Sequence, residues 1–343
     1  MKLHEVDPVL DERWIHFIER HASASLFHRP EWLQALQRTY GFQPVVFTDA
    51  PPGAALRNGL VFCRVPSWIT GSRLVSLPFS DHCEPLVESP EELHALLNSL
   101  RERIADEGRY IEMRPLTPLA ASDGFKPSAG YCLHSLDLRG ELSAVFARLH
   151  RSHIQRSIRK AERSGVAIEA GRSAELLNAF YVLHTMTRRR HRVPVQPFSW
   201  FRNLVDSLGD RVMLQVARYE RRAVAAMITA SHDRTLVYKY GCSDAAYHHL
   251  GATPLLFWRA IQDAKDRAAE ELDLGRTDLD DHGLLAFKDH LGATRRTLTY
   301  YRYPMADASR RANAWTPLAR HAYALVPRSI QAGISRAFYR HFA

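Results

Sequence analysis

The stretch Asp273-Leu274-Gly275-Arg276-Thr277 leads through an aspartate-rich segment to Gly283-Leu284-Leu285-Ala286-Phe287-Lys288, and Gly292 follows. Apolar residues ahead of Gly275 predict a strand over residues 271–274, and the second stretch predicts a short helix over residues 283–290. This unit carries one lysine, Lys288, into a region otherwise punctuated by aspartates and glycines. We therefore treat the strand, turn and helix as the centre of a candidate site.

Composition indicates a globular protein of two ordinary domains. The chain has 343 residues, of which 46% are hydrophobic and 24% are charged. Its four cysteines form no C-x-x-C pair, which favours a reduced cytosolic environment and argues against a structural zinc site. The N-terminus lacks the apolar run of a secretory signal, and no window is apolar enough to span a bilayer. We expect a cytoplasmic protein.

The net charge predicts a polyanionic partner. The formal charge is +9 at pH 7 and the sequence pI is near 9.5. Such a charge fits three kinds of partner: nucleic acid, anionic lipid and a phosphate-bearing small molecule. The net charge alone does not distinguish among them. Arginines cluster at residues 148–163, at 188–192 and in the C-terminal tail.

Element patterns divide the chain into three parts. The first half is mixed, with helices predicted at 9–21, 29–40 and 91–107 and strands at 45–47, 59–63, 73–77, 109–114 and 131–137. After Gly140 a basic helix is predicted over 142–164. The following elements are predicted in the order strand 166–170, helices 174–190 and 197–208, strands 211–219, 222–231 and 234–241, a helix capped by Thr253 with Pro254 first, and a strand at 294–303 after the central unit. We predict domains at 1–140 and 141–307 and a basic tail at 308–343.

This order resembles the FemAB-like branch of the GNAT acyltransferase superfamily. The matching residues are Arg156-Ser157-Ile158-Arg159-Lys160-Ala161-Glu162-Arg163-Ser164-Gly165-Val166, Thr187-Arg188-Arg189-Arg190, Tyr238-Lys239-Tyr240-Gly241, Asp273-Leu274-Gly275 and Phe287-Lys288, with Phe27-His28-Arg29-Pro30-Glu31-Trp32 and Pro78-Phe79-Ser80-Asp81 in the first half. The resemblance implies an α+β (mixed α/β) fold of two tandem GNAT-like domains with central mixed, largely antiparallel sheets, followed by a basic amphipathic helical tail. The best-known members add amino acids to peptidoglycan precursors, and others are associated with exopolysaccharide or protein-sorting (PEP-CTERM) systems.

The resemblance implies catalytic roles for Lys288 and Asp81. An amine that attacks an activated acyl carbon builds negative charge on the carbonyl oxygen, which a fixed cation stabilises. The family pattern gives this role to Lys288, with Phe287 packing beneath it. The alternative is an ordinary surface lysine of an amphipathic helix. Asp81 can orient or deprotonate the attacking ammonium, or it can be a turn aspartate bonding its own backbone; His82 is a weaker base candidate.

Five residues are predicted to bind substrate, and one of them is Phe287. Arg188 and Arg190 lie at the end of a helix, where they either complement the helix dipole or hold a phosphate bidentately. Because the arginines are repeated, the sequence does not distinguish Arg188 from Arg190 as the phosphate-binding residue. Tyr238 and Tyr240 alternate with Lys239 on a strand and place phenols in the site or pack in the core.

The acyl donor is left as aminoacyl-tRNA or acyl-CoA, with no tightly bound cofactor. The basic helix can dock tRNA phosphates electrostatically, or it is simply a solvated face. Residues 247–253 occupy the place of the acyl-CoA pyrophosphate loop but keep one glycine and lack its pattern, which weakens the acyl-CoA alternative. A third alternative is a non-catalytic domain that binds an envelope precursor.

No metal site is predicted, and the tail is predicted to meet the membrane. Asp278, Asp280, His282, Gly283 and Asp289 mimic part of a calcium loop but lack its bidentate glutamate. Over residues 308–343, apolar side chains recur opposite arginines, which suits a helix on an anionic membrane surface or one packed on the protein. The oligomeric state is not predicted.

Overall fold

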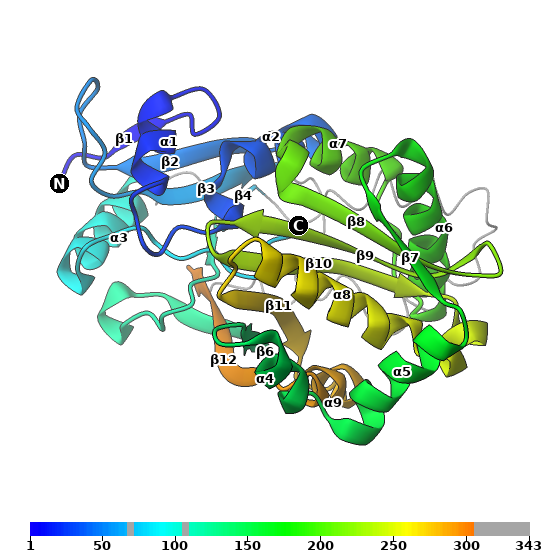
Figure 1. Ribbon diagram of the computed structural model, residues 1–343. Coiled ribbons are helices and arrows are strands. Elements are labelled where there is room, and N and C mark those ends of the chain that lie inside the picture. Colours follow the sequence, from blue (N-terminus) through cyan, green and yellow to red (C-terminus); the bar gives the residue numbers. More distant parts are fainter. Residues whose placement is uncertain (67–71, 105–109, 305–343) are drawn as a thin grey trace. The chain divides into compact units, whose positions relative to one another are not determined.

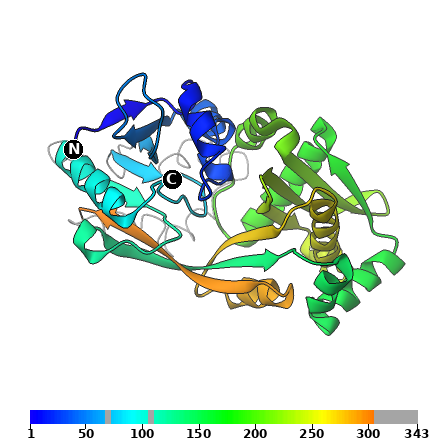
Figure 2. The ribbon, with the colours of Figure 1, turned by 60° about the vertical axis from the view of Figure 1, so that its left-hand side comes forward.

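The computed structural model describes residues 1–66, 72–104 and 110–304 (Figure 1). Contacts divide these residues into two units. Unit 1 is Met1–Gly130 with the described residues from Leu298 onward, and unit 2 is Tyr131–Thr297. Strands β6 (Lys126–Asp137) and β12 (Thr294–Tyr303) lie beside each other and contribute to both units (Figure 2). The predicted boundaries at residues 140 and 307 stay a prediction, and the tail at 308–343 lies outside the described residues.

Unit 1 is a mixed sheet with three α-helices among its described residues. The strand order is β1 (His4–Val6), β2 (Gln43–Thr48), β3 (Leu60–Val65), β4 (Arg73–Ser76), β5 (Tyr110–Met113) and β12. Among the described residues, β4 and β5 pair in parallel, whereas β1 with β2, β2 with β3, β3 with β4 and β5 with β12 pair antiparallel. The helices are α1 (Glu12–Ile18), α2 (Pro30–Tyr40) and α3 (Pro90–Ile104), with 3-10 turns at Leu26–His28 and Ala121–Asp123.

Unit 2 carries the central site in a second mixed sheet. Its strand order is β6, β11 (Glu271–Asp278), β10 (Thr235–Ser243), β9 (Arg222–His232), β8 (Val212–Tyr219) and β7 (Ala167–Gly171), with β10 and β11 parallel. Its helices are α4 (Leu142–Arg148), η4 (Arg151–Gln155), α5 (Arg156–Arg163), α6 (Ala174–Arg190), α7 (Phe198–Leu208), η5 (Gly209–Arg211), η6 (Ala245–Leu250), α8 (Ala252–Asp266) and α9 (His282–His290).

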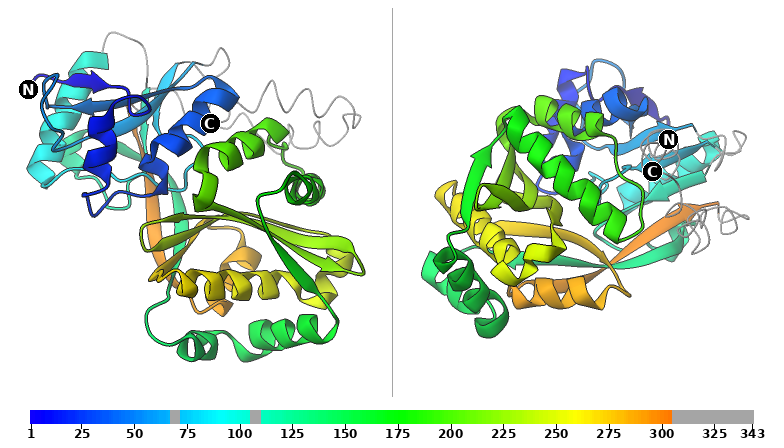
Figure 3. Two further views of the ribbon diagram at one scale, coloured as in Figure 1. Left: turned by 45° about the horizontal axis from the view of Figure 1, so that its top comes forward. Right: turned by 90° about the vertical axis from the view of Figure 1, so that its right-hand side faces the viewer.

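Helices cover both faces of the unit 2 sheet. Figure 3 shows α6 and α7 on one face and α8 on the other. On the α8 face, apolar side chains of α4, α5 and α8 form one core with β6, β9 and β11. Burial of this shared face is what holds α5, which has only Ile158 and Ala161 buried, against the rest of the unit.

The mixed α+β fold with tandem units is confirmed, and two local predictions are wrong. The basic helix over 142–164 is divided: Leu149 has extended backbone angles, and the five-residue π-helical turn η4 separates α4 from α5. Helix α8 begins at Ala252 rather than after a Thr253 cap, because Gly251 (φ 78°) adopts the left-handed conformation that ends η6. No helix among the described residues is long and apolar enough to cross a membrane.

Candidate functional site in unit 2

The site is built where two parallel strands both become irregular. Strands β10 and β11 pair over Thr235–Val237 and Glu271–Asp273. Immediately beyond, the register of β10 against β9 shifts between Tyr238 and Tyr240, and that of β11 against β6 shifts between Asp273 and Arg276. Bulges redirect side chains and interrupt pairing. The two neighbouring strands therefore lose regular geometry at the same level.

The β10 bulge places the two predicted tyrosines on opposite faces of the sheet. Tyr238 pairs with Thr229 but Tyr240 pairs with Ile228, and adjacent residues of β9 point to opposite faces. Tyr238 packs on Phe257 of α8, with ring centroids 4.7 Å apart. The Tyr240 hydroxyl instead accepts a hydrogen bond of 2.8 Å from Trp200 of α7. The two phenols do not line one surface, which corrects the simple alternation expected from the sequence.

Lys288 is buried at the β11 bulge. Only 2% of the residue is exposed, and its Nζ donates to the carbonyl oxygens of Gly275 at 2.9 Å and Arg276 at 3.3 Å. The alternative of an ordinary surface lysine is therefore excluded. Helix α9 can carry the charge to this position because Asp281 caps its N-terminus, accepting from the Leu284 N–H at 3.0 Å. The helix thus holds a fixed cation against the end of β11.

Aromatic packing fixes the same helix to the core. The ring centroid of Phe287 lies 5.4 Å from that of Phe257, which also contacts Tyr238. Phe287 is half-buried against the unit 2 core. Three of the predicted residues, Lys288, Phe287 and Tyr238, are thus drawn together around α9 and α8, whereas Tyr240 is held on the other face.

A buried histidine, not found from the sequence, lies beside this lysine. His134 of β6 is fully buried, with its Nε2 3.4 Å from Oδ1 of Asp289 on α9. Burial lowers the pKa of His134, and the nearby Lys288 charge lowers it further. Thr277, also buried, presents its hydroxyl from β11 in the same stretch. The burial of His134 depends on the irregular register of β11 opposite it, which sequence periodicity does not reveal.

The two predicted arginines separate at the end of α6. Nε of Arg188 donates to Pro194 O at 2.9 Å, whereas Nη1 of Arg190 donates to Ser243 O at 3.1 Å. Ser243 Oγ in turn lies 2.8 Å from Nε2 of His248. Burial lowers the pKa of His248, and the positive charge of Arg190 acts in the same direction. Arg190 is therefore connected to the wall of the cavity described next, and Arg188 is not connected by this route.

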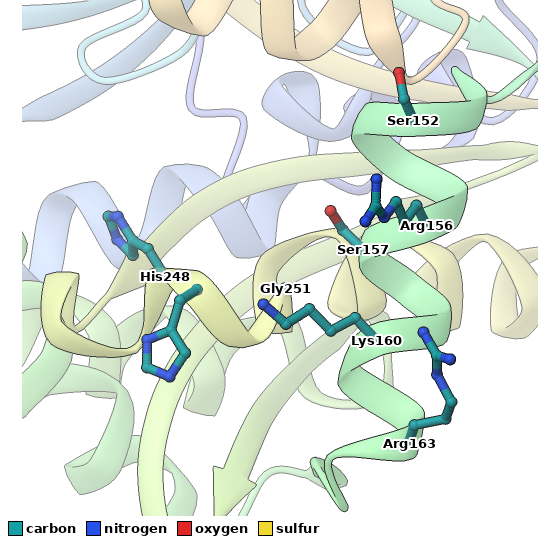
Figure 4. Close-up of a pocket in the computed structure, with 8 residues that line it drawn as sticks. Ser152, Arg156, Ser157, Lys160, Arg163, His248 and Gly251 are labelled. Atoms are coloured by element: carbon teal, nitrogen blue, oxygen red, sulfur yellow. The ribbon is translucent and has the colours of Figure 1, made fainter.

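A basic cavity of about 500 Å³ lies between α5 and the segment that begins α8. Figure 4 shows Lys160 extending from α5 toward the segment of His248, with Arg156 and Arg163 on the neighbouring turns. None of its lining residues is acidic; they are Ser152, Arg156, Ser157, Lys160, Arg163, His248, His249 and Gly251. Such a cavity attracts an anion.

Gly251 allows this cavity to form. Its φ is +78°, and a Cβ at this position would come within 2.5 Å of the Ser157 carbonyl oxygen. Only glycine combines that conformation with so close an approach of α5. Among the described residues no side chain caps the N-terminus of α8, which therefore presents the positive end of its dipole near the basic side chains of α5.

Asp81 belongs to unit 1, in a loop held by a buried charge network. Tyr300 donates to the Asp81 carbonyl oxygen at 2.6 Å, and Arg114 donates to the carbonyl oxygens of Leu77 and Ser80. Arg114 is itself fixed by Glu112 at 2.8 Å. Asp81 is half-buried, while the neighbouring His82 is buried. The loop is thus held by its backbone, and the catalytic role of Asp81 stays a prediction.

Glu112 is the charged centre of that network. It also accepts from Arg302 of β12, at 2.7 Å from Nη2. Burial raises the pKa of Glu112, but the two arginines outweigh this effect and bring it to about 2. In the acidic stretch that mimics part of a calcium loop, Asp278 and Asp280 are exposed, and the neighbouring Asp281 caps α9.

Known proteins share part of this sequence and the fold of the chain. Residues 148–289 match the family model described as the acetyltransferase (GNAT) domain. No curated protein sequence matches the chain. Among solved structures, FemX shares 15% identity at a TM-score of 0.68, over 88% of this chain and 97% of that chain.

Two further solved structures share the architecture. The C-terminal domain of a putative lysylphosphatidylglycerol synthetase from Agrobacterium fabrum has 15% identity and a TM-score of 0.59, over 91% of this chain and 96% of that chain. A tandem GNAT protein from the clavulanic acid biosynthesis pathway has 13% identity and a TM-score of 0.55, over 88% and 98%. At these identities the likeness establishes the fold, including its tandem arrangement.

Proposed function

We propose that this chain, which carries a GNAT acyltransferase domain at residues 148–289, transfers an acyl or aminoacyl group from a phosphate-bearing donor to an amine of a cell-envelope precursor. The observation that carries the proposal is the basic cavity at the start of α8. Its cationic lining and the helix N-terminus together suit a phosphate group. Aminoacyl-tRNA and acyl-CoA both supply that chemistry.

The donor phosphate is expected to contact α5 and the start of α8. Lys160 extends toward this segment, and Arg156 and Arg163 flank it on the exposed side of α5. Arg190 reaches the same wall through Ser243 and His248. We therefore favour Arg190 over Arg188 as the residue of the α6 end that acts on a bound phosphate.

Lys288 supplies the charge for the chemical step. Attack by the amine converts the acyl carbonyl into an oxyanion, and a cation fixed before the reaction stabilises it without reorganisation. The Gly275 and Arg276 carbonyl oxygens hold the ammonium in place, and Phe287 and Tyr238 complete the packing around α9 and α8. The amine must lose a proton during attack, and Asp81 remains our candidate to accept it. Collapse of the oxyanion then forms the amide and breaks the bond to the donor, whose departing thiolate (CoA) or alkoxide (tRNA) takes up a proton.

The acceptor class rests on the resemblance to FemAB-like enzymes and on the fold shared with FemX and with a domain of a putative lysylphosphatidylglycerol synthetase. We propose an amine of a peptidoglycan- or exopolysaccharide-related precursor. Peripheral membrane contact through residues 308–343 would bring the enzyme to such an acceptor and is part of the proposal.

Donor binding tests the cavity directly. Fluorescence anisotropy with a non-hydrolysable aminoacyl-tRNA and with acyl-CoA, each at low and high salt, separates the two donors and distinguishes specific from purely coulombic binding. We expect Lys160→Ala with Arg163→Ala to weaken the preferred donor by about tenfold or more. Arg202→Ala is the matched control, because Arg202 is an exposed arginine of α7 outside the cavity. Equal weakening by the control would remove the cavity from the proposal.

A further inference from the structure

Three histidines from two distant parts of the sequence meet at the end of α9. One ring nitrogen from each of His150, His153 and His290 lies within 4.8 Å of the others. The ring centroids are 4.4 to 4.7 Å apart in all three pairings. His150 directly precedes η4, His153 is the third residue of η4, and His290 is the last residue of α9. This histidine cluster, His150–His153–His290, has no part in the acyl transfer described above.

The backbone holds the two segments together independently of the side chains. The His150 N–H donates to the His290 carbonyl oxygen at 2.8 Å. The His153 backbone N–H donates to Nδ1 of His150 at 3.4 Å, and Ser152 Oγ lies 3.3 Å from the same nitrogen. Because Nδ1 accepts in this arrangement, the proton of the neutral ring is on Nε2. A metal ion therefore takes the Nδ1 lone pair in place of these donors, or binds Nε2 after the proton moves to Nδ1.

We propose that His150, His153 and His290 bind a zinc ion through three imidazole nitrogens. Three neutral imidazoles with a fourth position open to water form one of the ligand sets that zinc adopts. Hard cations such as Mg²⁺ prefer oxygen ligands and do not suit an all-nitrogen set. The site is independent of the identity of the acyl donor.

The geometry needs only side-chain adjustment. Tetrahedral Zn–N bonds of about 2.1 Å place the ligand nitrogens about 3.4 Å apart, so the present span must contract by about 1.4 Å. His150 and His153 are exposed and His290 is half-exposed, so their side-chain torsions can change without disturbing a packed core. The parallel stacking of His153 on His290 is given up when both rings turn toward the ion.

The helix dipole also favours an ion at this place. His290 is the last residue of α9, and the C-terminal end of a helix favours positive charge.

Zinc at this position would join the helix of Lys288 to the basic cavity. Lys288 lies two residues before His290 on α9, and Ser152 both contacts His150 and lines the cavity. Binding therefore couples the position of α9 to that of the η4–α5 segment. It adds a crosslink between residues far apart in the sequence, which stabilises the folded state.

Zinc titration of tag-free, full-length protein tests the site. We expect one tightly bound zinc per chain by competition with a chromophoric chelator, and a tetrahedral visible spectrum when Co²⁺ is the probe. His150→Ala, His153→Ala and His290→Ala should each weaken zinc binding by about 100-fold. His282→Ala is the matched control, because His282 is exposed on the same helix and outside the histidine cluster. It should bind like the wild type.

Thermal unfolding provides the second measurement. Zinc at a hundredfold excess over its Kd should raise the Tm of the wild type and of His282→Ala by about 4 °C. The three cluster variants should unfold at the wild-type temperature without zinc and gain nothing when it is added. A variant that combines His150→Ala, His153→Ala and His290→Ala gives the decisive comparison. The proposal is overturned if this triple variant binds zinc as tightly as the wild type, or if zinc raises the Tm of the triple variant and of the wild type equally.

Discussion

Replacing Lys288 by methionine should destabilise the protein by about 3 kcal/mol. Methionine has nearly the same length and volume, so the change creates little cavity. It removes the donor from two carbonyl oxygens, Gly275 O at 2.9 Å and Arg276 O at 3.3 Å, in a residue that is 2% exposed. Hydrogen bonds to a charged group contribute about 1.5–3 kcal/mol each, and the longer one should lie at the weak end. Relief of the buried charge offsets part of their sum.

Urea unfolding at 25 °C, followed by circular dichroism, measures this change in the free energy of unfolding. Lys126→Met is the control, because Lys126 is an exposed lysine at the start of β6 and should change stability by no more than about 0.5 kcal/mol. A Lys288→Met protein within about 1 kcal/mol of the wild type would refute the reasoning, since the two carbonyl contacts would then contribute little.

Three further predictions follow from other contacts. Glu112→Gln should lower the free energy of unfolding by about 3 kcal/mol at pH 7, measured by calorimetry. The difference between variant and wild type should shrink as the pH falls from 4.5 toward 2, because the lowered pKa of Glu112 stabilises the folded state above that range. A difference that does not change with pH would contradict this. Gly251→Ala should lower the free energy of unfolding by at least about 2 kcal/mol more than Gly165→Ala does, measured by urea unfolding. Both glycines have positive φ, but only a Cβ at position 251 would clash with the Ser157 carbonyl oxygen. Equal losses of stability would exclude the clash. Tyr240→Phe should lower the Tm through loss of the Trp200 bond, and an unshifted Tm would show that this bond is unimportant.

Much of the fold follows from local signals in the sequence. Helix α6 and strand β12 have the predicted bounds, because Ser173 caps α6 and the aromatic pattern of β12 is regular. The division of the basic helix could not be predicted from its charges. Leu149 has extended backbone angles that end α4, whereas the arginines continue past this residue at a similar spacing.

The candidate site was predictable only in part. The Phe287-Lys288 motif indicates Lys288 as a candidate, but its burial beside the register shift of β11 has no periodic signal in the sequence. The β10 bulge places Tyr238 and Tyr240 on opposite faces of the sheet, and this bulge likewise has no periodic signal in the sequence. The sequence places Lys160 in a basic run, whereas the cavity that it lines together with His248 depends on tertiary packing.

Mass spectrometry of a defined amine-bearing envelope precursor, incubated with each donor, tests acyl transfer most directly. The wild type should add one acyl or aminoacyl mass per acceptor with one of the two donors. Lys288→Met, kept at a temperature where it remains folded, should still bind that donor and lose about 99% or more of the turnover. Transfer at the wild-type rate by Lys288→Met, or no transfer by the wild type with either donor, would contradict the account.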